Sequence, residues 1–271
     1  MSDDLRTVAR RALDDVATNV GFARAVVDGT AAGELWCDEV RDPRAFHVVH
    51  PYGMSLVWGA DVASVVDEVA ARVLERRASG FTEWLQIDPR WDALDWDGAL
   101  GAVPLDATDP ASPPATTRHT RVNFTLDAVT VATRSDGVPL NDGWVARPAT
   151  EADFGVEGAV VPSAFWPNAR TFLAHGGGVV LERAGEVGAI AFVSYRWDEQ
   201  VEIGIETHPD HRRRGLARGA AATMIRTVLA SGATPVWSCR EDNTGSMRLA
   251  QSLGFVPVSW APYFHLDGRV P

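Results

Sequence analysis

Lysine is absent from the 271-residue sequence, and cysteine occurs only twice. The absence of lysine excludes Schiff-base chemistry and a phosphate-binding loop of the form G-x-x-x-x-G-K-[ST]. Cys37 and Cys239 lie far apart and form no ligand pattern, so we expect no metal site from them. The sequence has neither a signal peptide nor an apolar run near ~18 residues, which predicts a soluble cytoplasmic protein without a membrane partner.

Positive charge is scarce as well. Basic side chains number 25 against 36 acidic ones, which gives a net charge of −11. Such a chain is not expected to bind nucleic acid, and its charge is compatible with a cationic ligand. The seven histidines show no metal-ligand spacing, and His208-x-x-His211 is interpreted as a solvated turn. An apolar content of 46% is ample for the core of one large or two ordinary domains.

A strand, an arginine-rich loop and a helix are predicted in order between residues 201 and 232. Residues 201–207 alternate, so that Glu202, Gly204 and Glu206 share one face of the strand. The loop reads Arg212-x-x-Gly215-x-Ala217. Apolar residues at a spacing of four then mark one face of a helix: Leu216, Ala220, Met224 and Val228. Gly232 suits a left-handed cap at the end of that helix.

The loop before this helix is predicted to bind an anion. A helix N-terminus carries unpaired N–H groups and a partial positive charge. Small residues at Gly215 and Ala217 would let a pyrophosphate approach the backbone closely. Formal positive charge is added by Arg212, Arg213, Arg214 and Arg218. The pattern therefore favours a large phosphorylated cofactor, and the alternative is an arginine-rich helix start on a solvated face.

The pattern R-x-x-G-x-A between a strand and a helix resembles motif A of the GNAT superfamily of acetyl-CoA-dependent N-acetyltransferases. Downstream, N-x-x-S-x-x-L-A-x-x-L-G-F from Asn243 to Phe255 resembles the family's segment after its fifth strand. The resemblance covers about residues 143–266. It implies an α+β GNAT fold, a mixed and mostly antiparallel sheet flanked by helices, over residues 143–271.

The resemblance also implies acetyl-CoA as the cofactor. The residues it assigns to cofactor binding are Ile205, Thr207, Arg212, Arg213, Arg214, Gly215, Leu216, Ala217, Asn243 and Ser246. Asn243 can equally be the N-cap of a short helix that has Ser246 in its first turn. Within 144–153 the resemblance implies the family's first strand running into its first helix. Other expected elements are a strand at 234–239 and a hairpin of 178–184 and 186–197 that turns at Ala184-Gly185.

Residues 1–140 are expected to form an N-terminal α/β domain. The pattern predicts a first helix with Leu5, Val8, Ala12, Leu13 and Val16 apolar. It then predicts strands at 54–58, 82–87 and 121–126, a helix at 61–77, an irregular Trp-rich stretch to Trp96, and a loop over 101–120.

This order parallels the second half, but Gly59-Ala60-Asp61 replaces the anion loop. We therefore infer a degenerate GNAT-like half without a cofactor site; the alternative is an unrelated α+β extension. Its expected role is to support the structure, to line the acceptor cleft or to form a homodimer.

Two carboxylates are candidate bases for the chemistry that the resemblance implies. An alkylamine with a pKa of ~10.4 must lose a proton before it attacks a thioester. Glu202 and Glu206 flank Gly204, where the resemblance places the reacting end of the cofactor, and Glu206 is favoured because it is nearer the loop. The alternative is that both are edge carboxylates in water. A β-bulge here would free a backbone N–H to hold the thioester oxygen.

The leaving thiolate also needs a proton. Many GNAT enzymes have a tyrosine seven residues past the Asn, a position that is Ala250 here. Tyr263 is the remaining candidate acid, although a core aromatic is an alternative interpretation of it. Cys239 is interpreted as a strand-core residue and not as a nucleophile.

The expected function is therefore direct transfer of an acetyl group to a primary amine of a small, cationic molecule. The alternatives are a non-catalytic acetyl-CoA-binding regulatory protein and a protein or peptide N-acetyltransferase. The small-molecule amine is the expected partner.

Overall fold

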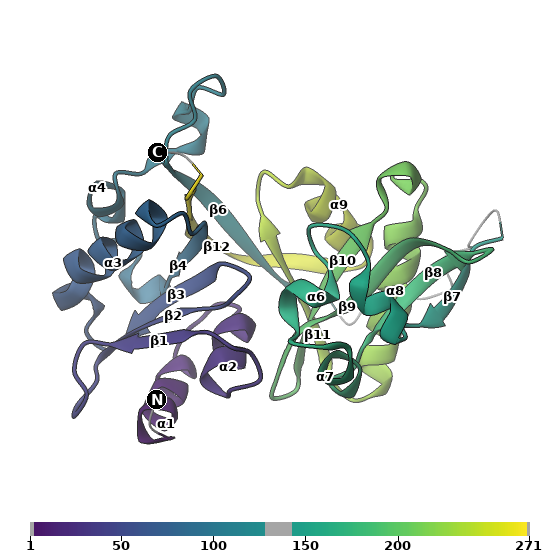
Figure 1. Ribbon diagram of the computed structural model, residues 1–271, viewed down its shortest axis with the longest axis horizontal. Helices are drawn as coiled ribbons and strands as arrows, with labels where there is room; N and C mark the ends of the chain where they lie inside the picture. The colour runs from purple at the N-terminus through teal and green to yellow at the C-terminus, as the bar shows by residue number, and fades with distance from the viewer. Residues whose placement is uncertain (1–2, 128–142, 270–271) are drawn as a thin grey trace. The chain divides into compact units, whose positions relative to one another are not determined.

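The computed structural model describes residues 3–127 and 143–269. The chain forms two compact units that do not follow its order. Unit 1 contains Met1–Val122, Arg240–Asp242 and Ser259–Pro271, and unit 2 contains Asn123–Cys239 and Asn243–Val258. Two long strands, β6 (Thr116–Leu126) and β12 (Phe255–Leu266), therefore contribute residues to both units (Figure 1).

Unit 1 is built on a mixed sheet in the order β1-β2-β3-β4-β12-β6. Its strands are β1 (Glu34–Cys37), β2 (Ala45–Val49), β3 (Met54–Gly59), β4 (Glu83–Ile87) and the short β5 (Val103–Pro104), which pairs with β6. The β3 and β4 strands are parallel, and β12 pairs with β4 in the antiparallel direction. The helices are α1 (Asp3–Leu13), α2 (Gly21–Val27), α3 (Val66–Ala78) and α4 (Trp96–Leu100), with 3-10 turns η1 (Val62–Val65), η2 (Pro89–Trp91) and η3 (Leu105–Ala107).

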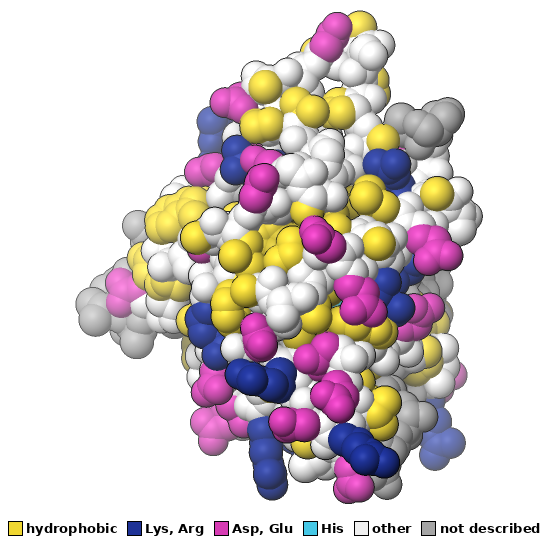
Figure 2. All heavy atoms as spheres, turned by 90° about the vertical axis from the view of Figure 1, so that its left-hand side faces the viewer, with side chains coloured by type: hydrophobic (Ala, Val, Ile, Leu, Met, Phe, Trp, Pro, Cys, Tyr) yellow, Lys and Arg dark blue, Asp and Glu magenta, His cyan; other side chains and the backbone are white. Residues whose placement is uncertain are grey.

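The core of unit 1 forms where α3 packs on this sheet. Val69 and Val73 lie on the buried face of α3, and they join Val57, Leu85 and Phe264 from three strands in one cluster. On the face that Figure 2 shows, basic side chains are interspersed with acidic ones and with apolar side chains. None of the helices within the described residues has the length and apolar character that crossing a bilayer requires.

The strands and helix expected at 54–58, 82–87 and 61–77 are confirmed, with a 3-10 turn at the start of the helix. The loop expected over 101–120 is wrong in part, because it contains β5, η3 and the first residues of β6. The Trp-rich stretch likewise contains η2 and α4. In α4, the Asp95 side chain accepts the Gly98 N–H at 2.9 Å and so caps the helix.

Unit 2 contains a mixed, mostly antiparallel sheet in the order β11-β10-β9-β8-β7. Its strands are β7 (Val145–Pro148), β8 (Gly178–Arg183), β9 (Glu186–Trp197), β10 (Gln200–Thr207) and β11 (Thr234–Arg240). The β10 and β11 strands are parallel, and the other neighbours are antiparallel. The helices are α6 (Pro162–Phe165), α7 (Ala169–Ala174), α8 (Leu216–Ala230) and α9 (Thr244–Ser252), with 3-10 turns η4 (Glu151–Gly155) and η5 (Pro209–His211).

Local patterns predicted much of unit 2. Leu216, Ala220, Met224 and Val228 are all buried on one face of α8. The hairpin of β8 and β9 turns at Ala184 (φ 52°) and Gly185 (φ 85°), two left-handed residues as a tight type I′ hairpin requires. The helix expected after β7 is wrong: η4 is a single 3-10 turn. The Asp153 carboxylate holds this turn by accepting hydrogen bonds from the Thr150 N–H and from Arg147.

Candidate functional site

The arginine-rich loop leads into α8 through two left-handed residues, Arg213 (φ 62°) and Gly215 (φ 80°). Gly215 is the N-cap of α8, and within residues 3–127 and 143–269 no side chain caps the first-turn N–H groups of this helix. A Cβ atom added at Gly215 would meet no heavy atom within 4 Å. The loop therefore presents unshielded backbone donors at a helix N-terminus, the geometry that binds phosphate groups.

The buried side chain of His211 supports the arginine-rich loop. The His211 side chain is 7% exposed, and its Nε2 lies 2.7 Å from the Glu186 carboxylate. Its Nδ1 lies 3.3 Å from the Arg214 guanidinium, and its ring packs at 5.0 Å edge-on against Trp144. The expectation that the His208-x-x-His211 turn is solvated is thus wrong for His211. The His211 contact also lowers the pKa of Glu186 below its ordinary value.

The remaining arginines of the loop differ in their contacts. Arg212 donates to the Thr207 carbonyl at 3.3 Å and lies 3.6 Å from the Glu206 carboxylate, while its side chain stays 61% exposed. Arg214 lies 6.0 Å from the centre of the Trp144 ring, and Arg183 covers the same ring at 4.7 Å. Arg214 thus fixes the loop against His211 and Trp144, whereas the exposed Arg212 guanidinium stays accessible to an anion.

Beside the loop, the parallel strands β10 and β11 separate. Their ladder joins Gln200, Val201 and Glu202 to β11 and then ends, although both strands continue. On the other side of β10, the register with β9 shifts between Glu202 and Ile203. The extra residue of this irregularity is Ser194 on β9, opposite Glu202 and Ile203, so it lies on the neighbouring strand and not at Gly204 of β10, where the sequence predicts a β-bulge.

Glu202 lies at this point of separation and is buried, with 6% of its surface exposed. The Ser238 hydroxyl donates to its carboxylate from β11, and the Ser194 hydroxyl donates to its carbonyl at 3.0 Å. The alternative of an edge carboxylate in water is therefore wrong for Glu202. Tyr195 pairs with Glu202 across the β9–β10 ladder, which places both on one face of the sheet.

Glu206 makes different contacts. Its Oε2 accepts hydrogen bonds from the backbone N–H groups of Ala159 and Val160 at 2.9 and 3.0 Å, and its Oε1 accepts from the Thr207 N–H at 3.0 Å. Gly158 allows this approach, because a Cβ there would lie 2.6 Å from the Glu206 side chain. Glu206 therefore fastens the segment after η4 to the end of β10.

Glu206 also lines a cavity of about 400 Å³ in unit 2. The cavity lies among η4, the first residues of β9 and the end of β10. Its carboxylates are Asp153, Glu157, Glu186 and Glu206. Arg147 is paired with Asp153 at 2.7 Å, and the Glu186 carboxylate contacts His211. Most of these carboxylates are thus engaged by groups of the chain itself.

The two polar residues nominated in α9 both serve the start of that helix. The Asn243 side chain accepts the Ser246 N–H at 3.1 Å, which confirms the expected N-cap. The Ser246 hydroxyl accepts the Trp237 Nε1–H at 3.0 Å. Ala250 is fully buried. The position that carries the acid in the family pattern therefore faces the interior.

Tyr263 belongs to unit 1, whereas the other nominated residues belong to unit 2. Its ring is stacked on Trp84 at 4.7 Å, and the Arg121 guanidinium lies 5.2 Å from the ring centre. Only 4% of its surface is exposed. Tyr263 is therefore a packed aromatic of the unit 1 sheet.

The segment Gly59-Ala60-Asp61 of unit 1, which the sequence sets in parallel with the anion loop, packs closely on neighbouring backbone. The β3 and β4 strands pair from Met54 to Val57, and the ladder is extended by the Asp88 N–H, which donates to the Val57 carbonyl at 3.0 Å. At Gly59 (φ 137°), a Cβ would lie 2.1 Å from the Arg44 carbonyl oxygen. That oxygen already accepts the N–H groups of residues 60 and 61. Backbone therefore fills the space beside Gly59 in unit 1, whereas the space beside Gly215 in unit 2 is open.

Comparison with known proteins finds a family model that matches part of the chain and solved structures that share its fold. Residues 146–261 match the model of the family described as GNAT acetyltransferase, which confirms the resemblance carried by the motifs. No protein among the curated sequences matches the chain significantly.

Several solved structures resemble the chain over almost its whole length. A GCN5-related N-acetyltransferase-like protein from Streptococcus suis has a TM-score of 0.68 at 18% identity and covers 96% of this chain and 98% of its own. A GNAT-family acetyltransferase from Colwellia psychrerythraea has a TM-score of 0.58 at 12% identity, with 97% and 96% covered. A tandem GNAT protein from the clavulanic acid biosynthesis pathway has a TM-score of 0.59 at 13% identity, with 97% and 94% covered. At these identities the likeness shows the fold alone, and that fold is the predicted GNAT fold.

Proposed function

We propose that residues 146–261, which match the GNAT acetyltransferase family, bind acetyl-CoA at the loop before α8 and transfer its acetyl group to a primary amine of a small cationic molecule. One observation carries this proposal. Gly215 forms an open, left-handed N-cap on α8, next to the point where β10 and β11 separate. This combination provides a phosphate site at the helix and free backbone along β10.

The residues of the loop fit the phosphorylated cofactor. The first N–H groups of α8, at Leu216 and Ala217, would receive the pyrophosphate, and Arg212 would add charge from its exposed side chain. Backbone groups of Ile205 and Thr207, on the part of β10 that β11 leaves unpaired, would bind the rest of the cofactor. Acetyl-CoA supplies an activated acetyl thioester when bound.

The chain must then deprotonate the amine. For an alkylamine of pKa ~10.4, the neutral form at pH 7 costs roughly 4–5 kcal/mol at 1.36 kcal/mol per pKa unit. We assign this role to Glu202, because the oxygens of Glu206 already hold three backbone N–H groups. Glu202 lies at the register shift, and the Ser238 hydroxyl fixes the orientation of its carboxylate. The sequence favoured Glu206; its contacts support a positioning role for that residue.

We propose that unit 1 is a degenerate GNAT-like half that binds no cofactor. The unbroken ladder of β3 and β4 and the closed position at Gly59 support this proposal. The tandem GNAT structure, which aligns with 97% of the chain, supports a second GNAT-like half. One acetyl-CoA is therefore expected per chain, measured by calorimetric titration; two sites, or none, would contradict the proposal.

A second candidate function is a non-catalytic acetyl-CoA sensor. The observation that favours it is the buried Ala250, which stands where the family pattern has a proton donor for the leaving thiolate. A thiol-release assay separates the two functions, because a sensor binds acetyl-CoA without turnover. The assay is run with a panel of acceptor amines that includes small diamines and short peptides. We expect the enzyme to acetylate small diamines fastest, because the cavity in unit 2 is lined by carboxylates.

The assignment of Glu202 is tested by Glu202→Gln, which keeps the size of the side chain and removes its basicity. We expect kcat to fall by about 10²-fold with little change in acetyl-CoA affinity. The loss should shrink as the pH rises toward 10, where the free amine is already populated. Glu199→Gln, an exposed substitution in the turn before β10, is the control. A loss that is the same at every pH would refute the role as base.

A further inference from the structure

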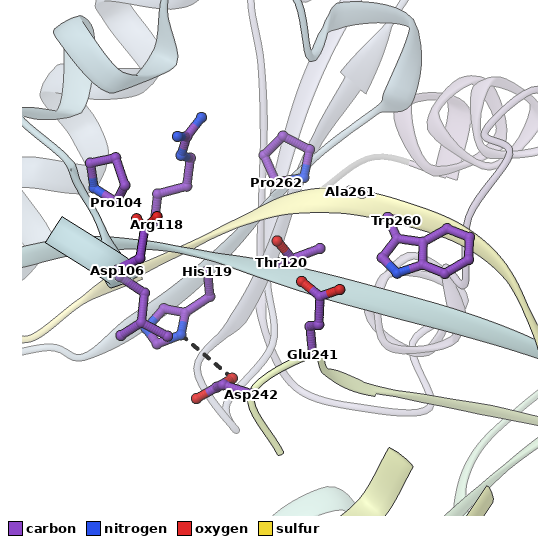
Figure 3. Close-up of a pocket in the computed structure, with 11 residues that line it drawn as sticks. Pro104, Asp106, Arg118, His119, Thr120, Glu241, Asp242, Trp260, Ala261 and Pro262 are labelled. Atoms are coloured by element: carbon purple, nitrogen blue, oxygen red, sulfur yellow. Dashed lines mark ion pairs between the residues drawn. The ribbon is translucent and has the colours of Figure 1, made fainter. Parts of the chain in front are cut away.

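Unit 1 contains its own cavity, of about 650 Å³, far larger than a water site requires. It lies where η3, the start of β6, the turn at 241–242 and the middle of β12 meet (Figure 3). The volume is in the range of sites that hold small organic molecules. Every lining residue belongs to unit 1.

The charge of this pocket is mainly negative. Its carboxylates come from Asp106, Glu241 and Asp242. The one guanidinium in the lining, that of Arg118, is paired with Asp97 at 3.3 Å. Among the described residues, no ion pair engages the carboxylate of Asp106 or of Glu241. These two exposed carboxylates are therefore available to pair with a cationic ligand.

An exposed aromatic ring forms another wall. Trp260 is 53% exposed, unusual for a side chain with so much apolar surface. It lines the pocket together with apolar residues, among them Leu105 and Pro262. Figure 3 shows the Glu241 carboxylate between the Trp260 ring and the His119–Asp242 pair. An organic cation attracted by the carboxylate would thus find an aromatic face beside it, and cations bind such faces.

His119 provides an independent sign of a ligand site. Its side chain lines the pocket and is 8% exposed. Among the described residues its buried Nδ1 has no partner within hydrogen-bond range, and the Asp242 carboxylate oxygen lies 3.7 Å away. Asp242 is also held by Arg240 at 3.2 Å. Buried polar atoms are nearly always hydrogen-bonded, so this nitrogen is available to a polar group of a ligand in the pocket.

We propose that this pocket of unit 1 binds a small organic cation, a primary ammonium group carried on an apolar body. The ammonium lies against Glu241, and the apolar body packs on Trp260 and Pro262. The lining residues of this pocket belong to unit 1, whereas the loop before α8 belongs to unit 2, and the proposal does not depend on acetyl transfer.

Calorimetric titration of the full chain without acetyl-CoA tests the proposal. The probe is 2-phenylethylamine, with 2-phenylethanol as its neutral analogue and 3-phenylpropanoate as its anionic one. We expect saturable binding of the amine, binding at least about tenfold weaker for the alcohol, and none for the carboxylate. No saturable heat with the amine, or equal affinity for the alcohol, would overturn the proposal.

Variants locate the binding. Glu241→Gln and Trp260→Ala should each weaken the affinity for 2-phenylethylamine by about tenfold. Glu34→Gln, an exposed carboxylate on β1 of the same unit, and Val40→Ala, an exposed apolar residue, are matched controls that should leave it unchanged.

Amine binding that is unchanged in both pocket variants would place the site elsewhere and overturn the proposal. Trp260→Leu keeps apolar bulk without the aromatic face, and it should also weaken binding. Circular dichroism of each variant verifies that it is folded.

Discussion

Gly215 and Gly232 lie just outside the two ends of α8, and their comparison separates backbone strain from cofactor binding. Both residues have φ near 80°, and a Cβ at either position would meet no heavy atom within 4 Å. An alanine at either position therefore has no clash and pays only for the left-handed backbone, about 1–2 kcal/mol. Gly215→Ala and Gly232→Ala should consequently destabilise the chain by similar amounts.

Binding of acetyl-CoA should respond to one of the two changes. At Gly215 the new methyl group projects beside the free N–H groups that α8 offers to phosphate, whereas Gly232 lies at the opposite end of the helix. A charge-assisted hydrogen bond contributes about 1.5–3 kcal/mol. The loss of one such bond would weaken binding from about tenfold to more than hundredfold, since 1.4 kcal/mol is a factor of ten.

The assay combines two measurements on the parent and on both variants. Thermal unfolding reports the strain, with a shift of about 2–4 °C for each kcal/mol. Calorimetric titration reports the dissociation constant of acetyl-CoA. Equal stability losses with weaker binding in Gly215→Ala alone are expected. Binding that is unchanged in Gly215→Ala, or equally weakened in both variants, would refute the assignment of the loop as the phosphate site.

Burial lowers the pKa of His50 to about 4, so the folded chain keeps it neutral while the unfolded chain takes up a proton below about 6.5. The free energy of unfolding should therefore fall as the pH falls from about 6.5 to 4, and His50 should contribute up to about 3 kcal/mol of this fall. Urea unfolding of the parent and of His50→Asn over this pH range should show a smaller fall in the variant. Tyr263→Phe should change kcat by less than about tenfold, because its ring is stacked within unit 1; a drop of ~10²-fold in thiol release would instead assign a general acid to it. Tyr195→Phe, the matched change beside Glu202 in unit 2, should have the larger effect.

The elements that the sequence predicted well are those with a strong local pattern. The four-residue spacing in α8, the Ala184-Gly185 turn and the Asn243 cap each depend on neighbours within a few positions, and all three are confirmed. The fold follows from the same motifs, because R-x-x-G-x-A fixes a strand, a loop and a helix in order.

The elements that were missed have weak local patterns. Every residue of β2 is buried, so the strand lacks the alternation that marks a half-buried strand, and it contains His47. The first residues of β6 lie within a segment rich in Pro, Ala and Thr, a composition that indicates a loop. Their burial depends on the partners in the sheet, which local sequence does not show.

At the candidate site, local sequence likewise could not predict the different contacts of Glu202 and Glu206. Glu202 and Glu206 look alike in sequence, two positions apart on one strand. Their difference comes from distant partners: Ser238 on β11 for Glu202, and the backbone of residues 159 and 160 for Glu206. The support of the loop by Glu186 likewise spans 25 positions. Such contacts follow from the register of the strands and from the path of the loops.

The sharing of β12 has a consequence for how the chain is made. Tyr263 to Leu266 pair with β4, and nearby the Thr82 hydroxyl donates to the Asp267 carboxylate across 185 positions of sequence. At about 5–20 residues per second, a ribosome needs roughly 10–40 s to deliver that strand after β4 has emerged. Until then the outer edge of β4 lacks its partner, and unpaired strand edges recruit other chains. The N-terminal part of unit 1 is therefore synthesised first, but the sheet of this unit is completed only when β12 has emerged. Slow elongation between residues 87 and 259 would favour aggregation of nascent chains.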